Sequence, residues 1–180
     1  TIADTLGVGG VFRALRTIPG MVDFGRDMEE VCPDAWLLNY TNPMCMLTGA
    51  MLQMTNVKTV GLSHSVQVCA PGLLNELGIG YDDSVQWKIA GINHQAWLLE
   101  CTKNGVDLYP EIKRRAAAIT EKHDDMVRLD YIDKFGYYCT ESSEHNAEYN
   151  AFYIKPNRPD LIEKFNIPLD EYPRRCIAQI

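Results

Sequence analysis

Hydrophobic and polar positions alternate between helical and strand-like patterns in the first third of the chain. Residues 11–18 place apolar side chains at helical spacing with arginines between them, and residues 21–31 continue in the same style after Pro19-Gly20. This pattern predicts a helix pair or one kinked helix. Residues 35–40 form a short apolar run whose length suits a buried parallel strand. Asn42 is then expected to cap a helix over residues 44–54, with Pro43 at its first position.

The alternation continues to Gly78 and changes near residue 84. Residues 58–62 predict a strand and residues 66–77 a helix, and the order strand, helix, strand, helix is typical of a parallel sheet. Residues 85–90 and 96–102 predict two further strands, with a hairpin at Asn104-Gly105. Residues 109–134 and parts of 158–180 read as helical. We therefore expect an α/β fold in which a Rossmann-like parallel sheet over residues 1–84 passes into a mixed α+β region over residues 85–180.

The composition and charge of the chain argue against nucleic acids and membranes as partners. The chain has 180 residues, 46% of them hydrophobic and 23% charged, which is ordinary for a globular protein. Its 17 basic and 24 acidic residues give a net charge of −7 without a basic stripe, which argues against a nucleic acid partner. The most apolar stretch, residues 43–54, is shorter than the roughly 20 residues of a membrane span. We expect neither nucleic acid nor membrane as a partner.

The six cysteines are irregularly spaced and form no CxxC pair, so they predict reduced core thiols in a cytoplasmic protein. The sequence opens with Thr-Ile-Ala-Asp and shows no signal peptide. It has the character of an internal piece of a longer chain.

Three polar clusters follow predicted strands or hairpin edges: residues 40–43, 63–65 and 91–94. Taken singly, each has a structural explanation, because Asn42 can cap a helix, His64 can begin one, and Asn93 with His94 can form a turn. Ligands of open α/β sheets lie outside the carboxyl ends of the strands, and neutral imidazole is the commonest metal ligand. We therefore expect His64 and His94 to approach one another around a metal or a sugar.

The segment from Thr140 to Tyr149 concentrates carboxylates and His145 without a lysine or arginine. It suits a solvated acidic loop, and it equally suits the carboxylate, histidine and tyrosine lining of a sugar site, where neighbouring carboxylates raise each other's pKa toward that of a base. His123, beside two aspartates, is expected at an exposed helix boundary.

Six blocks in order carry a resemblance to a known family. They are Asp4-Thr-Leu-Gly-Val-Gly-Gly, Asn39-Tyr-Thr-Asn-Pro-Met, Val60-Gly-Leu-Ser-His-Ser-Val-Gln, Ala90-Gly-Ile-Asn-His, Glu141-Ser-Ser-Glu-His and Pro168-Leu-Asp-Glu-Tyr-Pro-Arg-Arg. Together they resemble the α-galactosidase branch of glycoside hydrolase family 4 over essentially the whole chain. Members of that family are longer and begin with a strand and Gly-rich loop for NAD that is not seen in this sequence. The resemblance implies a C-terminal region like that of lactate and malate dehydrogenases.

The resemblance implies that the protein hydrolyses an α-galactoside with the help of NAD and a divalent metal, usually Mn²⁺. NAD takes hydride from the sugar C3, a base then removes the acidified C2 proton, the glycosidic oxygen is expelled, water adds and the hydride returns. The metal holds the C2 and C3 oxygens, which is Lewis-acid work. The family is among the exceptions to the two-carboxylate glycosidase scheme. A homo-oligomer is implied for the full-length protein.

The resemblance also carries roles onto single residues. It implies that His94 is a metal ligand, that Asn42 and Asn93 contact the sugar or the nicotinamide, and that Asp4 lines the sugar site. His64 matches the histidine that follows the family's metal-binding cysteine, with a catalytic or sugar-binding role. His145 is expected to bind the sugar.

The position of that cysteine holds Ser63, and a neutral hydroxyl is a much weaker metal ligand than a thiolate. The C2 base is an Asp or Tyr in the family, and here Glu141, Tyr137 and Tyr138 compete for that role.

Three functions follow as hypotheses. The first is the NAD- and Mn²⁺-dependent α-galactosidase, with α-glucosidase or α-galacturonidase as alternatives within the family. The second is a catalytically silent sugar- or nucleotide-binding relative, motivated by Ser63. The third, a dehydrogenase, lacks support because the Asn-His and Glu-Ser-Ser-Glu-His blocks have no place in that class.

Overall fold

A computed structural model describes residues 5–169 and 171–180, which divide into two compact units. We call residues 5–63 the N-terminal unit and residues 64–180 the C-terminal unit; the break lies between Ser63 and His64. The predicted domain division at residue 84 instead coincides with the change from parallel to antiparallel strands.

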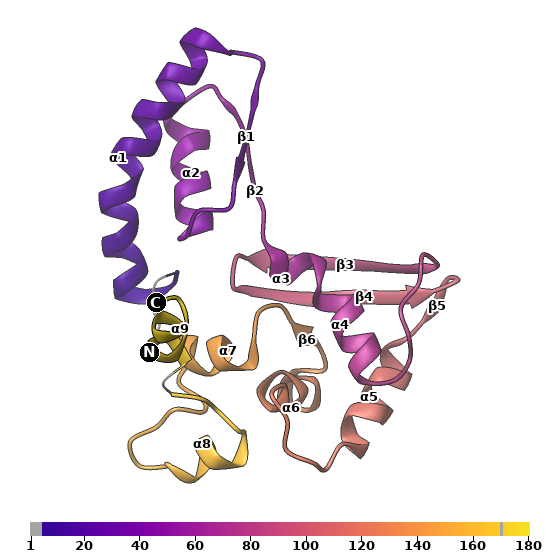
Figure 1. Cartoon of the computed structure of the whole chain (residues 1–180). Coiled ribbons are helices and arrows are strands. Elements are labelled where there is room, and N and C mark those ends of the chain that lie inside the picture. The colour runs from indigo at the N-terminus through magenta and orange to yellow at the C-terminus, as the bar shows by residue number, and fades with distance from the viewer. Residues whose placement is uncertain (1–4, 170) are drawn as a thin grey trace. The chain divides into compact units, whose positions relative to one another are not determined.

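The N-terminal unit alternates helix and strand as the pattern predicted. Its elements are α1 (Gly7–Val31), β1 (Trp36–Asn39), α2 (Met44–Met54) and β2 (Lys58–Gly61). β1 and β2 pair in parallel, from Trp36 opposite Lys58 to Asn39 opposite Gly61, and α2 lies between α1 and this strand pair (Figure 1). The expected parallel sheet is confirmed.

Close packing between α1 and α2 restricts one position of α1. α1 is a single helix with Pro19 inside it, and not a pair. A Cβ on Gly25 would lie 2.5 Å from the terminal methyl of Met51 in α2, so a larger residue here would require Met51 to shift. Pro43 has an extended ψ of 105° and precedes α2, so its predicted place as the first helical residue is wrong. The N-cap of α2 is Pro43 and not Asn42 as predicted, although Asn42 Oδ1, one residue earlier, accepts the Met44 N–H at 3.4 Å.

The C-terminal unit is built on an antiparallel sheet. β3 (Val85–Ile92) and β4 (Gln95–Lys103) form a hairpin, and β4 also pairs with β5 (Val106–Asp107) and β6 (Tyr138–Cys139). The helices are α3 (His64–Gln67), α4 (Cys69–Glu76), α5 (Tyr109–Ala118), α6 (Met126–Phe135), α7 (Ser143–Tyr149), α8 (Asp160–Lys164) and α9 (Glu171–Ala178). α4, α5 and α6 pack against the sheet through a core that includes Leu73, Leu98 and Ile112 (Figure 1).

Several boundaries differ from the predictions. The expected helix over 66–77 is divided into α3 and α4, and that over 109–134 into α5 and α6. The predicted hairpin is confirmed, since Asn104 and Gly105 have φ of 52° and 79° and join β4 to β5. The segment from Glu141 to Tyr149 contains α7, whose residues 143–147 are buried, so it is not a solvated loop. Several of its polar side chains hydrogen-bond to one another or to neighbouring backbone.

The cysteines are free thiols, but only some of them belong to the core. Cys69, Cys101 and Cys139 are buried, whereas Cys32 and Cys176 are exposed, which corrects the expectation for these two. Burial raises the pKa of Cys69 to about 12 and that of Cys101 to about 11, so both thiols stay protonated and inert near neutral pH.

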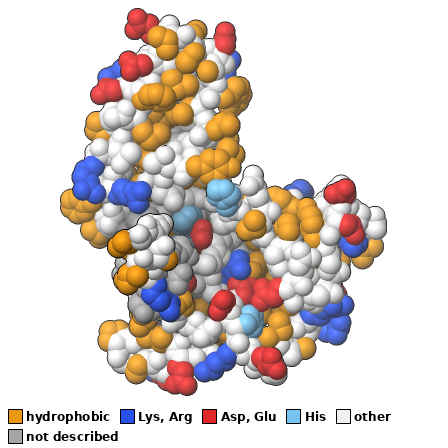
Figure 2. Space-filling view, viewed as in Figure 1, with side chains coloured by type: hydrophobic (Ala, Val, Ile, Leu, Met, Phe, Trp, Pro, Cys, Tyr) orange, Lys and Arg blue, Asp and Glu red, His pale blue; other side chains and the backbone are white. Residues whose placement is uncertain are grey.

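Much apolar side-chain surface of the N-terminal unit faces solvent. Figure 2 shows hydrophobic side chains over this unit, and the exposed ones include Val8, Phe12, Leu15, Trp36 and Leu38. Among the helices that the structure describes, none is long and apolar enough to cross a membrane.

Candidate metal centre

His94, Glu141 and His145 come together in the C-terminal unit. One potential ligand atom from each lies within 4.8 Å of the other two. His94 Nε2 is 3.1 Å from Glu141 Oε2, and the two side chains are only 11% and 16% exposed. The imidazole rings of His94 and His145 stack with centroids 5.6 Å apart. We call these three residues the His-Glu-His cluster.

Strand pairing explains how residues far apart in sequence meet here. Ile92 pairs with Gln95, so Asn93 and His94 form the two-residue turn of the β3–β4 hairpin. The end of β6 lies beside the start of β4, where the Thr140 N–H donates to the Ala96 carbonyl at 2.9 Å and the Ala96 N–H donates to Thr140 Oγ1 at 3.3 Å. Glu141, the next residue, is thereby placed at the hairpin turn.

The start of α7 adds His145 to the cluster. Ser142 is the N-cap of α7, and its hydroxyl accepts the His145 N–H at 3.1 Å. The Asn146 side chain is buried and donates to the carbonyls of Thr140 and Ser142 at 2.9 and 3.0 Å. These bonds fix the short segment that carries Glu141, so the carboxylate is held between a strand and a helix.

Two more side chains contact the imidazoles from the last turn of α7. His94 Nδ1 lies 3.2 Å from the Tyr149 hydroxyl, and His145 Nδ1 lies 3.2 Å from Glu148 Oε2. Both imidazoles therefore have a polar partner on the Nδ1 side.

The ligand set of the cluster is two imidazoles and one carboxylate. Such nitrogen and oxygen donors suit Mn²⁺, Fe²⁺ or Zn²⁺, whereas a thiolate-rich set would favour softer ions. The separation of the donor atoms is compatible with all three binding one ion. The residues present therefore fit a divalent transition metal.

The other candidates for the C2 base lie in different surroundings. Tyr138 is fully buried, and its hydroxyl donates to Asp125 Oδ2 at 2.6 Å. Burial and the Asp125 charge hold the pKa of Tyr138 well above its usual range. Tyr137 is 43% exposed and packs edge-on against Tyr109. Neither tyrosine is a member of the His-Glu-His cluster.

The remaining predicted site residues are divided between the units. Asn42 and Ser63 belong to the N-terminal unit, and His64, exposed at the start of α3, to the C-terminal unit. Asn93 is buried in the hairpin turn next to His94. Asp4 lies outside the described residues. His64 is not a member of the His-Glu-His cluster, and it follows a strand of a different sheet from the strands that flank His94.

Sequence reasoning missed a second polar network around His123. This residue was expected to be exposed, but its Nδ1 lies 2.9 Å from Glu76 Oε1, and its Nε2 is buried without a hydrogen-bond partner among the described residues. Asp125, two residues further along the chain, is buried. It pairs with Arg128 and accepts the Ser143 hydroxyl at 3.1 Å. The only signal in the sequence was the Asp-Asp pair after His123, which reads equally well as solvated.

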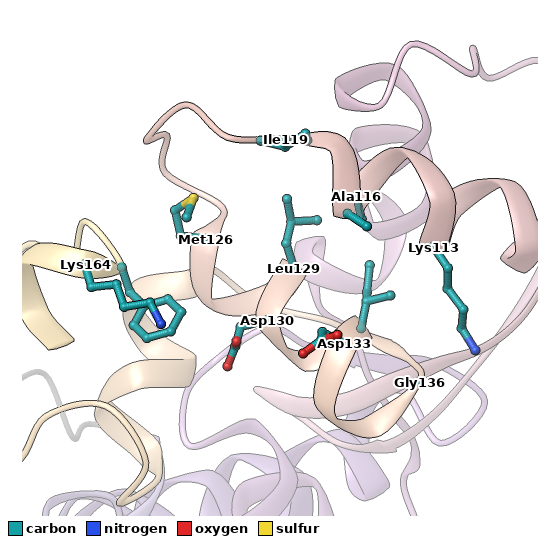
Figure 3. Close-up of a pocket in the computed structure, with 12 residues that line it drawn as sticks. Lys113, Ala116, Ile119, Met126, Leu129, Asp130, Asp133, Gly136 and Lys164 are labelled. Carbon is teal, nitrogen blue, oxygen red and sulfur yellow. The ribbon is translucent and has the colours of Figure 1, made fainter.

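A pocket of about 570 Å³ between α5, α6 and α8 contains none of the predicted site residues (Figure 3). Its two carboxylates, Asp130 and Asp133, both pair with Lys134. Among the described residues, the group of three potential metal ligands that comes together is the His-Glu-His cluster and not this pair of carboxylates.

Known proteins similar to the chain point to one family. The sequence model described as "Family 4 glycosyl hydrolase" matches residues 1–79, and "Family 4 glycosyl hydrolase C-terminal domain" matches residues 89–180. An "Alpha-galactosidase" of Bacillus subtilis is 65% identical over the whole chain, and one of Rhizobium meliloti is 38% identical over 91% of it. The chain spans 42% and 34% of the lengths of these two relatives.

Solved structures show the same fold. A 6-phospho-alpha-glucosidase from gut microorganisms, solved in complex with NAD and Mn²⁺, matches 98% of this chain with a TM-score of 0.69 at 18% identity, and the match covers 45% of that chain. The fold class predicted from the hydrophobic pattern is confirmed. With both of its regions matched by the corresponding family models, the chain belongs to glycosyl hydrolase family 4.

Proposed function

We propose that this chain is part of a glycosidase that cleaves α-galactosides with the help of NAD and a divalent metal such as Mn²⁺. The His-Glu-His cluster is the observation that carries the proposal, because it offers metal ligands in the part of the chain that matches the family's C-terminal domain. The 65% identity to an α-galactosidase supports the choice of sugar. α-Galacturonidase is the alternative substrate class, since one such relative is 29% identical over 94% of the chain.

His94, Glu141 and His145 would hold the metal. A bound divalent metal supplies Lewis-acid stabilisation of negative charge on sugar oxygens, and bound NAD supplies reversible acceptance of a hydride. Asn42, after the first strand of the parallel pair, would contact the nicotinamide or the sugar, and Asn93 would contact the sugar beside His94. Near β1, a pocket of about 570 Å³ lined by Arg16, Asn39 and Thr41 offers room for part of a dinucleotide.

Removal of the C2 proton is the alternative role of Glu141, because its carboxylate does not hold the metal and accept a proton at once; among the three base candidates it has the strongest support. Its carboxylate faces His94 in the cluster, whereas the Tyr138 hydroxyl is engaged by Asp125 in the core. A base must lie within hydrogen-bond reach of the proton that it abstracts. Tyr137, being partly exposed, is the second candidate. His64, Asp4 and His145 are proposed to line the sugar site, as the family resemblance implies.

The metal site can be tested by calorimetric titration of the chain with MnCl₂. The parent chain is expected to bind one Mn²⁺, and His94→Ala and Glu141→Gln are expected to weaken binding by at least about tenfold, since each removes or neutralises a ligand. His123→Ala is the matched control, because His123 contacts Glu76 and is not in the cluster. Failure of the parent to bind Mn²⁺ would refute the site. Hydrolysis of an α-galactoside by the full-length protein with NAD tests the activity.

Ser63 favours a second candidate, a catalytically silent sugar-binding relative. A serine at the place of the family's metal-binding cysteine weakens the ligand set, so metal binding could be too weak to support turnover. Galactoside binding by the full-length protein without hydrolysis at saturating Mn²⁺ and NAD would favour this candidate over the enzyme.

We also propose a cytoplasmic location and a homo-oligomeric full-length protein. The free cysteines support the first, since disulfides are rare in that compartment. The exposed apolar side chains of the N-terminal unit support the second.

A further inference from the structure

We infer that Tyr149 and Glu148 are positioning residues that fix the two imidazoles of the His-Glu-His cluster in the form that binds metal. Each contacts the Nδ1 of a different histidine, Tyr149 that of His94 and Glu148 that of His145, both at 3.2 Å. The inference rests on the metal site proposed above and adds to it the residues behind the ligands.

The contact of Tyr149 with His94 is compatible with either tautomer of the imidazole. A neutral imidazole has one N–H, and only the other nitrogen can bind a metal. If the proton is on Nε2, it is donated to Glu141, which lies 3.1 Å away, and the ring cannot act as a ligand on that side. If it is on Nδ1, it is donated to the Tyr149 oxygen, and the Nε2 lone pair faces the cluster. The Tyr149 hydroxyl can donate to Nδ1 in the first form and accept its proton in the second, so it supports the ring in the metal-binding tautomer once an ion takes the place of the proton on Nε2.

Glu148 favours the His145 tautomer with the proton on Nδ1, because its carboxylate is a charged group that can only accept a hydrogen bond. A carboxylate that accepts the Nδ1–H of a metal-binding histidine fixes the tautomer and orients the ring. The two side chains are 11% and 5% exposed, so solvent screens their interaction little. The contact with Glu148 thus keeps the proton of His145 on Nδ1, which leaves the Nε2 lone pair available for a metal.

Helical spacing makes this arrangement compact. His145, Glu148 and Tyr149 occupy positions i, i+3 and i+4 of α7, which lie on one face of a helix. The ring of Tyr149 packs 5.4 Å from that of His145 and 6.0 Å from that of His94. One helical turn therefore carries a ligand together with the residues that support both histidines.

The test measures Mn²⁺ affinity by calorimetry in the parent chain, Tyr149→Phe, Glu148→Gln and the control Tyr153→Phe. The control loses a comparable hydroxyl, which donates to Asp130 at 2.8 Å and contacts neither histidine. We expect Tyr149→Phe and Glu148→Gln each to weaken Mn²⁺ binding by about 10–100-fold, the usual range for partners of metal ligands. Tyr153→Phe is expected to bind as the parent does.

Imidazole ¹⁵N chemical shifts of the metal-free proteins provide a readout that a purely structural role would not move. In Glu148→Gln the proton of His145 is expected to shift from Nδ1 toward Nε2, because an amide can also donate to Nδ1, while His94 keeps its tautomer. Parent-like affinity and tautomers in both variants would overturn the inference alone. If the parent itself binds no Mn²⁺, the proposed metal site is wrong and the inference falls with it.

Discussion

His94 and Glu141 face each other with Nε2 and Oε2 3.1 Å apart, and both have a left-handed backbone, with φ of 65° and 68°. A non-glycine residue in this region costs about 1–3 kcal/mol, which the surrounding structure must offset. Here the β3–β4 turn fixes one residue, and the bonds of Thr140, Ser142 and Asn146 fix the other. Backbone strain is thus concentrated at the two residues whose side chains meet in the cluster.

Replacement of Glu141 separates this strain from the chemistry of the carboxylate. Glu141→Gly should be more stable than Glu141→Ala by about 1 kcal/mol, because glycine adopts a positive φ without steric cost. Urea denaturation measures the difference. At the exposed Glu121, whose φ is not positive, the order should reverse, with the glycine variant the less stable. An alanine variant at 141 as stable as the glycine variant would show that the position is not strained.

Asn146 should be essential for the placement of Glu141. Its buried amide donates to the carbonyls of Thr140 and Ser142, so Asn146→Ala leaves both acceptors without this donor. We expect a loss of about 2 kcal/mol in the free energy of unfolding and weaker Mn²⁺ binding in the variant that remains folded. Asn75→Ala, which removes an exposed acceptor of the Tyr81 N–H, is the control and should change neither much. Parent-like Mn²⁺ affinity in Asn146→Ala would mean that the segment keeps its place without these bonds.

The hydroxyl of Tyr138 should matter for stability and not for the metal. It donates to the buried carboxylate of Asp125, which also pairs with Arg128, so Tyr138→Phe removes one donor from a buried acceptor. The expected loss is about 1–3 kcal/mol in the free energy of unfolding, with Mn²⁺ affinity unchanged in calorimetry. A fall in Mn²⁺ affinity without a fall in stability would instead show that Tyr138 contributes to the metal site.

The sequence predicted elements whose pattern is local and missed those that depend on distant partners. β1, α2, β2 and the hairpin strands could be recognised because their apolar periodicity and turn residues suffice to define them. The pattern of the α7 segment fitted a solvated loop and a sugar site equally well, because Glu144, His145 and Asn146 are polar and yet buried. Their hydrogen-bond partners include local groups, such as Glu148 for His145, but the stacking of His145 on His94 depends on the pairing of β6 with β4, which no local pattern contains.

The same reasoning explains which site residues could be found. His94, Glu141 and His145 were each recognised as candidates from residue type and motif, but their grouping depends on the register of β6 against β4. His123 was judged by its charged neighbours, whereas its actual partner is Glu76 in α4, 47 positions earlier in the chain.

Stability should fall at low pH through Asp82, which lies just before β3. Hydrogen bonds from Lys103 and Ser84 hold the pKa of Asp82 at about 2, below its usual 3.8. A depressed pKa means that the carboxylate stabilises the folded state above the unfolded pKa, and this contribution is lost as the pH falls from about 4 through about 2. The melting temperature of Asp82→Asn should therefore lie below that of the parent at neutral pH, and the gap should close near pH 2. A gap that is constant with pH would exclude this linkage.

Ser63 provides the sharpest test of the family resemblance. If this position contributes to the metal site, as the matching block implies, Ser63→Cys should tighten Mn²⁺ binding, because a thiolate is a far stronger ligand than a hydroxyl. Changes of this kind in metal sites move affinity by about 10–100-fold, and the gain is bounded by how well neighbours selected around a hydroxyl accommodate sulfur. Calorimetric titration of both proteins at one pH measures the change, with hydrolysis of an α-galactoside by the full-length protein followed in parallel. Ser65→Cys, two residues further along the chain, is the matched control and should bind as the parent does. Unchanged or weaker affinity in Ser63→Cys would show that Ser63 does not bind the metal, and the His-Glu-His cluster would then have to hold it without this residue.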